Sequence, residues 1–474
     1  MPLGLVALTL SVAGIVSAVL MLVSLGQRPL WFDETVSVEA ARLSTSSLAH
    51  YVATVESNMS LYHVLLHLWL GLGSSDGFAR SLSVLFGLMT LPVLFALARR
   101  LFDTRTAAIA VVLLAANVNF VGHAREARGY SLAVLLVTVS SLFLVRAVQD
   151  GERRQWLLFG VAGVLAVYAH LLAALAVAAQ LGSVLILRRR ISMRPLASTA
   201  AAMTLLLAPL AAALLLHEQR RQIDWITQPR PRQLPGLFVW FTESWTLSAL
   251  FGAAALLALA AAVTGWRSDR TGMRRWRYVL VVAWLVVPPA AAFVISFAQP
   301  VYLYRYFLVC LPALVILVAA GIARIERTWI VIPIVVAAVA LSARTTVECT
   351  PGCVIGEDDW RSAAVYVDTQ LRPGDGVIFV PAALRTPFAH YLQPSRRPRL
   401  VYPARWPLEG GDAEGTARLP AALDTAQSRS RIWVVSWWLP VDDVPERLAR
   451  DRGAPIVRDF AGNVRVRLYG ASSS

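Results

Sequence analysis

The sequence predicts a polytopic α-helical membrane protein that ends in a small α/β domain. Of its 474 residues, 57% are hydrophobic and only 15% are charged, which excludes an ordinary set of soluble domains. Apolar stretches long enough to cross a bilayer core of roughly 30 Å recur as far as Ala343. From about Thr345 the composition becomes that of a soluble domain. We therefore expect a transmembrane domain over residues 1–343 and an α/β domain over residues 344–474.

Short arginine-rich links separate the apolar stretches, and the positive-inside rule places such links in the cytoplasm. They account for most of the net charge of +15, so this charge does not indicate nucleic-acid binding. Because these arginine clusters all lie on the cytoplasmic side, the chain must cross the membrane an even number of times between one cluster and the next. This rule predicts about eleven helices, a cytoplasmic N-terminus and an extracytoplasmic C-terminal domain. The first apolar stretch has no basic n-region and is expected to be a retained helix in the plasma membrane. We expect helices near residues 4–25, 80–98, 106–122, 129–147, 155–168, 170–187, 196–216, 246–264, 278–298, 305–322 and 329–343.

Two longer segments fall on the expected outer side. In the first, the outer loop 26–79, the stretches Ser37–Ser57 and Leu61–Leu72 have the mixed pattern of helices lying along the interface. Alternatively, Leu61–Leu72 is a short membrane span. The second segment, from His217 to about Trp245, carries Arg220 and Arg221 against the positive-inside trend. Binding of an anionic lipid or of a donor phosphate would account for these arginines, and an ordinary solvated loop is the alternative.

Alternating and buried-strand patterns predict the fold of the C-terminal domain. The expected elements are a helix over Trp360–Leu371, a turn over residues 373–376, a strand over Val377–Val380, strands within Arg431–Trp437 and Ile456–Leu468, and a helix over Pro445–Arg452. This region contains no Gly-x-Gly-x-x-Gly fingerprint, so nothing in it argues for a nucleotide-sugar donor. Cys349 and Cys353 flank a short turn and can close a disulfide if they face an oxidising compartment.

Two adjacent carboxylates, in Trp31-Phe32-Asp33-Glu34-Thr35, follow the first helix at the outer boundary. Such a pair suits acid/base chemistry, because an acceptor hydroxyl must lose its proton as it attacks an anomeric carbon. The alternative is structural: acidic residues also cap helix N-termini, and the following segment is expected to be helical.

Four motifs accompany this pair. They are Ser60-Leu61-Tyr62-His63-Val64-Leu65-Leu66-His67-Leu68-Trp69, Phe78-Ala79-Arg80-Ser81-Leu82-Ser83, Arg99-Arg100-Leu101-Phe102 and His123-Ala124-Arg125-Glu126-Ala127-Arg128-Gly129-Tyr130. Over about residues 28–148 the chain thereby resembles the GT-C glycosyltransferases related to protein O-mannosyltransferases and to the lipid A aminoarabinose transferase. One departure is Met59-Ser60, where the usual proline before the Leu-Tyr pair is missing.

The resemblance implies a GT-C fold and a polyprenyl-phosphate sugar as donor. An outer-loop aspartate is the catalytic base in such enzymes, which implies that Asp33 is the base here and that Glu34 orients it or is a second acceptor. The expected reaction is an inverting transfer to a cell-envelope glycan, lipid or protein. The alternatives from other classes are a transporter or flippase of a lipid-linked saccharide and a non-catalytic assembly protein. Because the acidic and basic residues collect at one face, the sequence favours the enzyme.

Candidate binding residues lie at the expected outer ends of helices. Arg125, Glu126 and Arg128 either bind substrate or form an ion-pair lattice that steadies a turn. Arg305, with Tyr306, either holds the donor phosphate or snorkels from an aromatic belt. Tyr62, His63 and His170 complete the expected binding set, with His170 at a turn between two short spans.

The sequence leaves open whether the protein binds a divalent metal ion. His63 and His67 are spaced i, i+4 and would share one helix face, which permits a metal pair, although such residues more often only line an interfacial helix. Asp33, Glu34 and Glu126 can also surround an ion if the fold brings them together. Membrane lipid is an expected partner in either case.

Overall fold

The computed structural model describes residues 3–216, 225–265, 269, 271–348, 358–392, 400–402, 429–437 and 444–470. Arg220, Arg221, Cys349 and Cys353 lie outside the described residues, so the expectations about them stay predictions. The chain forms two compact units. Unit 1 comprises Met1–Leu25, Glu56–Leu65 and Arg80–Pro351, and unit 2 comprises Gly26–Val55, Leu66–Ala79 and Gly352–Ser474. The division into domains at residues 343 and 344 stays a prediction.

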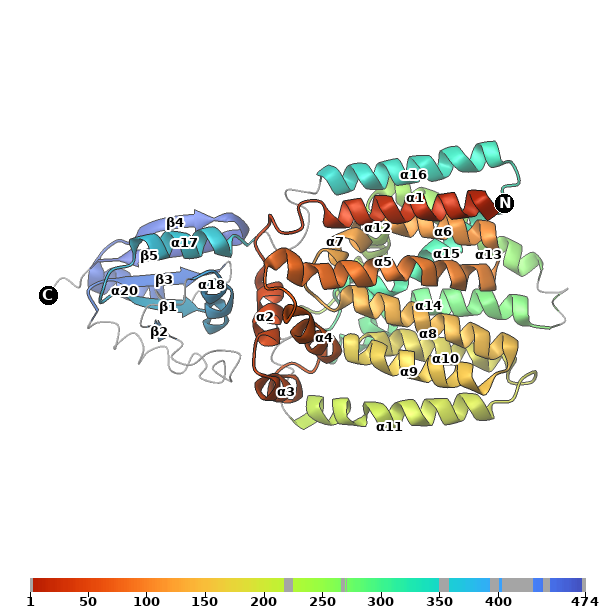
Figure 1. Ribbon diagram of the computed structural model, residues 1–474, viewed down its shortest axis with the longest axis horizontal. Coiled ribbons are helices and arrows are strands. Elements are labelled where there is room, and N and C mark those ends of the chain that lie inside the picture. Colours follow the sequence, from red (N-terminus) through yellow and green to blue (C-terminus); the bar gives the residue numbers. More distant parts are fainter. Residues whose placement is uncertain are drawn as a thin grey trace. The chain divides into compact units, whose positions relative to one another are not determined.

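A helix lies at each of the eleven expected positions, and the long helices of unit 1 run side by side in roughly the same direction (Figure 1). They are α1 (Leu3–Leu22), α5 (Asp76–Leu101), α6 (Thr104–Ala116) with α7 (Val118–Ala124), α8 (Tyr130–Asp150), α9 (Arg153–Ala169), α10 (Ala173–Val184) with η1 (Leu185–Leu187), α11 (Arg194–Leu216), α13 (Trp245–Thr264), α14 (Met273–Ile295), η3 (Tyr304–Cys310) with α15 (Leu311–Ile322), and α16 (Thr328–Glu348). A further helix, α12 (Gln233–Thr242), precedes α13.

Eight of the described helices are long and apolar enough to cross a membrane, and nine if α6 and α7, bent by 60°, form one span. The chain is therefore a multi-pass membrane protein, as predicted. Helix α9 has 17 residues and Ala173–Leu187 is shorter still. For this reason the helix lengths do not establish eleven crossings, and that number stays a prediction.

The helices of unit 1 differ in how much of their surface is buried, which distinguishes central helices from peripheral ones. Every residue of α15 is buried, and Gly321 lies so close to the carbonyl of Ala254 on α13 that a Cβ would not fit. By contrast, α1, α11 and α16 expose large apolar side chains such as Leu8, Leu215 and Trp329. Hydrophobic faces this extensive need a covering, and lipid provides it.

In unit 2 the outer loop folds into helices. They are α2 (Phe32–Ala41), α3 (Thr45–Thr54) and the later part of α4 (Ser60–Leu70), which begins in unit 1. The side chain of Ser44 caps α3 by accepting a hydrogen bond from the N–H of Ser47. With 11 residues, α4 is about 17 Å long, too short for a bilayer core. Its length therefore favours the expected helix outside the core over the alternative of a span.

The C-terminal part of unit 2 contains a five-stranded mixed sheet in the order β2-β1-β3-β5-β4. Strand β1 pairs in parallel with β2 and β3, whereas β5 pairs antiparallel with β3 and β4. The predicted helices and strands of this domain are confirmed. Its elements are α17 (Trp360–Gln370), β1 (Gly376–Val380), η4 (Ala382–Leu384), α18 (Arg385–Tyr391), β2 (Leu400–Tyr402), β3 (Ile432–Ser436), α20 (Val444–Arg452), β4 (Ile456–Phe460), η9 (Ala461–Asn463) and β5 (Val464–Tyr469).

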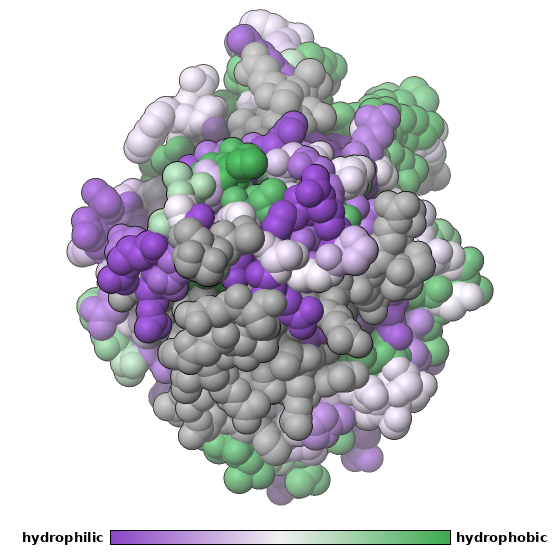
Figure 2. All heavy atoms as spheres, turned by 90° about the vertical axis from the view of Figure 1, so that its left-hand side faces the viewer, coloured by the Kyte–Doolittle hydropathy of each residue, from purple (hydrophilic) through white to green (hydrophobic). Residues whose placement is uncertain are grey.

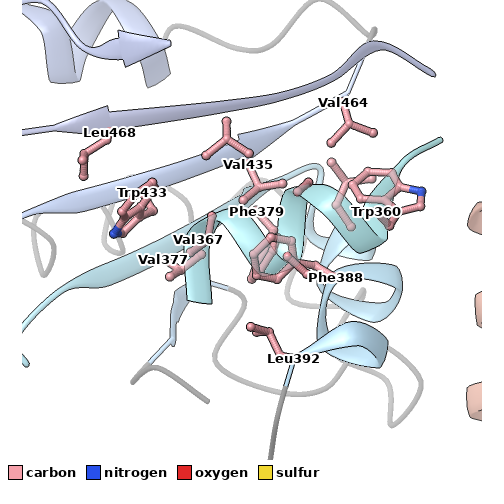
Figure 3. Close-up of a cluster of buried hydrophobic side chains, with 14 residues drawn as sticks. Trp360, Val367, Val377, Phe379, Phe388, Leu392, Trp433, Val435, Val464 and Leu468 are labelled. Carbon is pink, nitrogen blue, oxygen red and sulfur yellow. The ribbon is translucent and has the colours of Figure 1, made fainter. Parts of the chain in front are cut away.

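Alternation along the central strands gives this sheet two buried faces. On one face, Val377 and Phe379 of β1 join side chains of β3, β5, α17 and α18 in one core (Figure 3). On the other, Ile378 and Val380 pack with Val444 and Leu448 of α20. In the view of Figure 2, many of the described residues nearest the viewer are hydrophilic, as expected for a domain in water.

Candidate active site

The adjacent carboxylates Asp33 and Glu34 lie in the first turn of α2. Glu34 is fully buried, and its Oε2 accepts a hydrogen bond from the N–H of Trp31 at 3.3 Å. The capping alternative therefore describes Glu34, whose carboxylate stabilises the N-terminus of the helix. Asp33 is only partly buried and belongs to the same turn.

A second carboxylate, Asp358, lies near Asp33 within unit 2. The ring of Phe32 stacks on Trp437 at 5.6 Å, and the Trp437 Nε1–H donates to Asp358 Oδ1 at 3.1 Å. Burial raises the pKa of Asp358 to about 6, and the charge of Asp33 acts in the same direction against the hydrogen bonds to Asp358. Asp358 was not singled out in the sequence, because nothing local distinguishes it from other acidic residues before a helix.

Unit 1 contains a second group of predicted residues, gathered around His170. The turn expected near this residue is confirmed, since α9 ends at Ala169 and α10 begins at Ala173, but the His170 side chain is buried. Its ring lies 4.9 Å from that of Tyr306. The rings continue from His170 to Tyr130 at 5.7 Å, to His123 at 5.3 Å, to Trp240 at 5.9 Å and to Tyr304 at 6.2 Å.

Two buried arginines belong to this group. The guanidinium carbon of Arg305 lies 5.8 Å from the ring centres of both Trp225 and Tyr306. A snorkelling side chain would reach water, so the burial of Arg305 favours the binding role over the anchor role. Arg128 is also buried, with its Nη2 atom 3.8 Å from Glu56 Oε1.

His170 lies between helices α9 and α10, outside both. Its Nδ1 accepts a hydrogen bond from the N–H of Leu172 at 3.2 Å. Burial, and then the charges of Arg128 and Arg305, lower the pKa of His170 to about 3. The ring is therefore neutral and carries its hydrogen on Nε2, which has no hydrogen-bond partner within the described part of the chain. The arrangement presents one neutral and two cationic donors, which suits an anionic ligand.

Comparisons with known proteins identify the fold that contains these residues. Residues 60–215 match the family described as dolichyl-phosphate-mannose-protein mannosyltransferase. The structure is similar to that of ArnT from Cupriavidus metallidurans, solved bound to undecaprenyl phosphate, with a TM-score of 0.65 and 16% identity over 99% of this chain and 98% of that one. It is also similar to the archaeal oligosaccharyltransferase AglB from Archaeoglobus fulgidus, solved with an inhibitory peptide and a dolichol-phosphate. There the TM-score is 0.54 and the identity 11% over 99% of this chain and 74% of that one.

The chain has the GT-C fold. This confirms the resemblance that the motifs of residues 28–148 predicted. A search of curated protein sequences found no match to the chain.

In this GT-C chain the two neighbours of Arg128 in the predicted motif have structural contacts. Glu126 Oε2 lies 3.0 Å from Nδ1 of the buried His123, and Arg125 Nη2 donates to the carbonyl of Val23, just beyond α1, at 2.7 Å. These contacts favour a structural role over substrate binding for Glu126 and a tethering role for Arg125.

Tyr62 is linked to the backbone of Arg128 through Ser83. The Tyr62 hydroxyl lies 2.8 Å from Ser83 Oγ, which donates to the carbonyl of Arg128 at 3.1 Å. A Cβ at Gly129 would lie 2.8 Å from the Ala169 carbonyl and 3.2 Å from Tyr62 Cβ. Both Tyr62 and His63 are fully buried, and the contacts of Tyr62 favour a supporting role for this residue over direct binding.

The break between α6 and α7 positions Trp240, which the sequence did not indicate. The side-chain amides of Asn117 and Asn119 donate to the carbonyls of Phe241 and Trp240 at 2.9 and 2.5 Å. Glu243 Oε1 accepts a hydrogen bond from the N–H of Val118 at 2.6 Å. The C-terminal end of α12 is thereby attached to the break in the GT-C bundle, which places the Trp240 ring beside His123.

The expected metal ligands do not converge where the structure is described. Both ring nitrogens of His67 have hydrogen-bond contacts within unit 2: Nδ1 lies 2.8 Å from the Ala41 carbonyl oxygen, and Nε2 lies 3.3 Å from Thr45 Oγ1. Among the described residues, no group of three or more His, Cys, Asp or Glu side chains is placed to hold a metal ion.

Proposed function

We propose that the chain is a glycosyltransferase that transfers a sugar from a polyprenyl-phosphate donor to an acceptor on the outer side of the plasma membrane. The buried group of Arg128, Arg305 and His170 carries this proposal. It lies within a fold shared with ArnT and AglB, which were solved with undecaprenyl phosphate and dolichol-phosphate respectively.

Electrostatics favours a phosphate at this group. An arginine matches the oxygens of a phosphate in a fixed fork geometry, and its charged hydrogen bonds to phosphate are stronger than those between neutral groups. His170 adds a neutral N–H without adding charge. In glycosyl transfer the lipid phosphate gains negative charge as the bond to the sugar breaks, so these donors stabilise the transition state more than the ground state.

Asp33 is proposed as the base. The acceptor hydroxyl gives its proton to the Asp33 carboxylate while its oxygen bonds to the anomeric carbon. The bond between this carbon and the phosphate oxygen breaks, and its electron pair leaves with the polyprenyl phosphate. A single displacement of this kind inverts the anomeric configuration, which is the expected outcome. The capping contact of Glu34 supports the reaction by fixing the turn that carries Asp33.

The experiment uses the full chain in nanodiscs with a radiolabelled polyprenyl-phosphate sugar and a cell-envelope extract as acceptor. Wild type should bind the donor and label the acceptor, and Asp33→Asn should retain donor binding but lose about 10²- to 10⁴-fold in transfer rate. Glu326→Gln, at an exposed carboxylate, is the matched control and should behave as wild type. Lipid movement without transfer, unaffected by Asp33→Asn, would instead support the flippase alternative.

A further inference from the structure

A buried histidine of the C-terminal domain contacts two carboxylates of the outer loop, all within unit 2. His390 lies on α18, and its side chain is only 3% exposed. Its Nδ1 lies 2.7 Å from Glu39 Oε1 on α2, and its Nε2 lies 3.1 Å from Asp76 Oδ1 at the start of α5. Both ring nitrogens therefore face carboxylate oxygens.

The other charged and titratable groups around His390 come from all the elements packed against it. Nη1 of Arg42, just after α2, lies 2.7 Å from Glu39 Oε1 and 3.2 Å from His390 Nδ1. Arg361 of α17 and the hydroxyl of Tyr391 each donate to Asp76 Oδ2 at 3.0 Å. Each carboxylate thus has a second cationic or hydroxyl donor besides His390.

The two carboxylate contacts favour a charged histidine. A neutral imidazole has one donor and one acceptor nitrogen, so one lone pair would face a carboxylate oxygen, whereas an imidazolium donates from both nitrogens. Burial opposes the charge, but the hydrogen bonds and charges of Asp76 and Glu39 outweigh it and raise the pKa of His390. Burial likewise favours neutral Glu39, but His390 and then Arg42 outweigh it and lower the pKa of Glu39.

The contacts of the C-terminal domain hold α2 at both ends. At its start, the N–H of Leu30 donates to the Tyr391 hydroxyl at 2.7 Å, and Phe32 stacks on Trp437. Towards the C-terminal end of α2, Glu39 contacts His390. Asp33 lies between these points, six residues or about 9 Å along the helix from Glu39.

We propose that His390 is a positioning residue for the reaction: as an imidazolium bridging Glu39 and Asp76, it fixes α2 and thereby the carboxylate of Asp33. According to this proposal, the C-terminal domain positions α2, the helix that carries Asp33. This inference rests on the proposed role of Asp33.

The first test is independent of activity. Hydrogen exchange of the full chain in nanodiscs, corrected for intrinsic rates, reports the protection of the amides of residues 33–42. His390→Gln should lower this protection at least about tenfold, the loss of roughly 1.4 kcal/mol, while the amides of α15 stay protected. His50→Gln, at an exposed histidine of α3, is the matched control. Wild-type protection of α2 in a folded His390→Gln protein would overturn the proposal.

The second test uses pH. In wild type, protection of α2 and the transfer rate should both fall as the pH rises through the raised pKa of His390. Glu39→Gln removes one stabilising charge, so this alkaline fall should move to lower pH, a shift that a merely structural role would not produce. If His390→Gln fails to fold, His390→Gln combined with Glu39→Gln also removes the charge of the carboxylate that faces Nδ1 and gives the same comparison. An alkaline fall that is absent from wild type, or unmoved in Glu39→Gln, would overturn the proposal.

Near-normal transfer by Asp33→Asn would instead refute the proposed function, whatever the exchange data show.

Discussion

The carboxylate of Glu34 accepts a hydrogen bond from the backbone N–H of Trp31 at 3.3 Å and so closes the first turn of α2. Its neighbour Asp33 projects from the same turn and remains partly exposed. Two adjacent acidic residues that look equivalent in the sequence thus have different surroundings. A side chain committed to a cap is poorly placed to receive a substrate proton, and this difference can be measured.

Glu34→Ala should cost about 1 kcal/mol of stability, because it removes the cap of α2, and should lower the transfer rate less than Asp33→Asn does. Asp33→Asn should leave the melting temperature close to that of wild type and abolish most transfer. The two variants are compared by thermal unfolding in detergent and by the transfer assay. A stable Glu34→Ala protein with as little activity as Asp33→Asn would mean that Glu34 acts directly in the reaction.

Arg305→Ala should weaken binding of polyprenyl phosphate roughly 10- to 100-fold, because a charge-assisted hydrogen bond contributes about 1.5–3 kcal/mol. Arg305→Lys keeps the charge but loses the fork geometry, so its affinity should be intermediate. Binding is measured by titration of the lipid phosphate into nanodiscs.

Arg125→Lys is the matched control for these variants. Its side chain donates to the Val23 carbonyl, a contact that a lysine can make as well. Equal affinities for wild type and Arg305→Ala would remove Arg305 from the phosphate site.

The helices could be predicted from sequence because each depends on a local apolar pattern, and a helix lies at all eleven expected positions. The strands of the C-terminal domain were predictable for the same reason. Contacts between distant residues were not predictable. His390 and Asp76 are 314 positions apart, and no local feature of either residue indicates the other.

The candidate site was predicted only in part. Arg128, His170 and Arg305 could be singled out because ionisable residues at membrane-helix junctions are unusual, and Tyr306 because it follows Arg305. Glu56, Trp240 and Asp358 were missed, because their positions depend on how the loops fold. Tyr62 and Glu126 carried a motif signal, yet the structure gives them partners inside the protein.

The side of the membrane is predicted by the arginine clusters rather than by the fold. A reporter fused within residues 267–277 should report the cytoplasm, and one fused after Ser342 should report the outer side, because one helix pair and a further crossing separate them. Both fusions are assayed with a phosphatase that is active only outside and with a fluorescent protein that matures only inside. The same side for both would refute the predicted threading.

Asp358 should make stability depend on pH. The pKa of Asp358 is raised from its usual 3.8 to about 6, first by burial and also by the charge of Asp33. A carboxyl group with a raised pKa stabilises the folded state most when it is protonated, so its contribution is full below about pH 3.8 and falls as the pH rises through about 6. Asp358→Asn keeps an oxygen to accept the Trp437 N–H but cannot ionise.

The free energy of unfolding of Asp358→Asn should therefore exceed that of wild type at pH 8, by on the order of 1 kcal/mol after allowance for solvent screening. Near pH 4 the two proteins should be equally stable. Thermal unfolding of the full chain in detergent at the two pH values measures the difference, with Asp451→Asn, at an exposed position, as the control. Asp33→Asn removes one cause of the raised pKa of Asp358, so in this variant the fall in stability should be smaller and should be complete at a lower pH than in wild type. A gain for Asp358→Asn that is the same at both pH values would show that packing, rather than the charge of this buried carboxyl group beside Asp33, explains it.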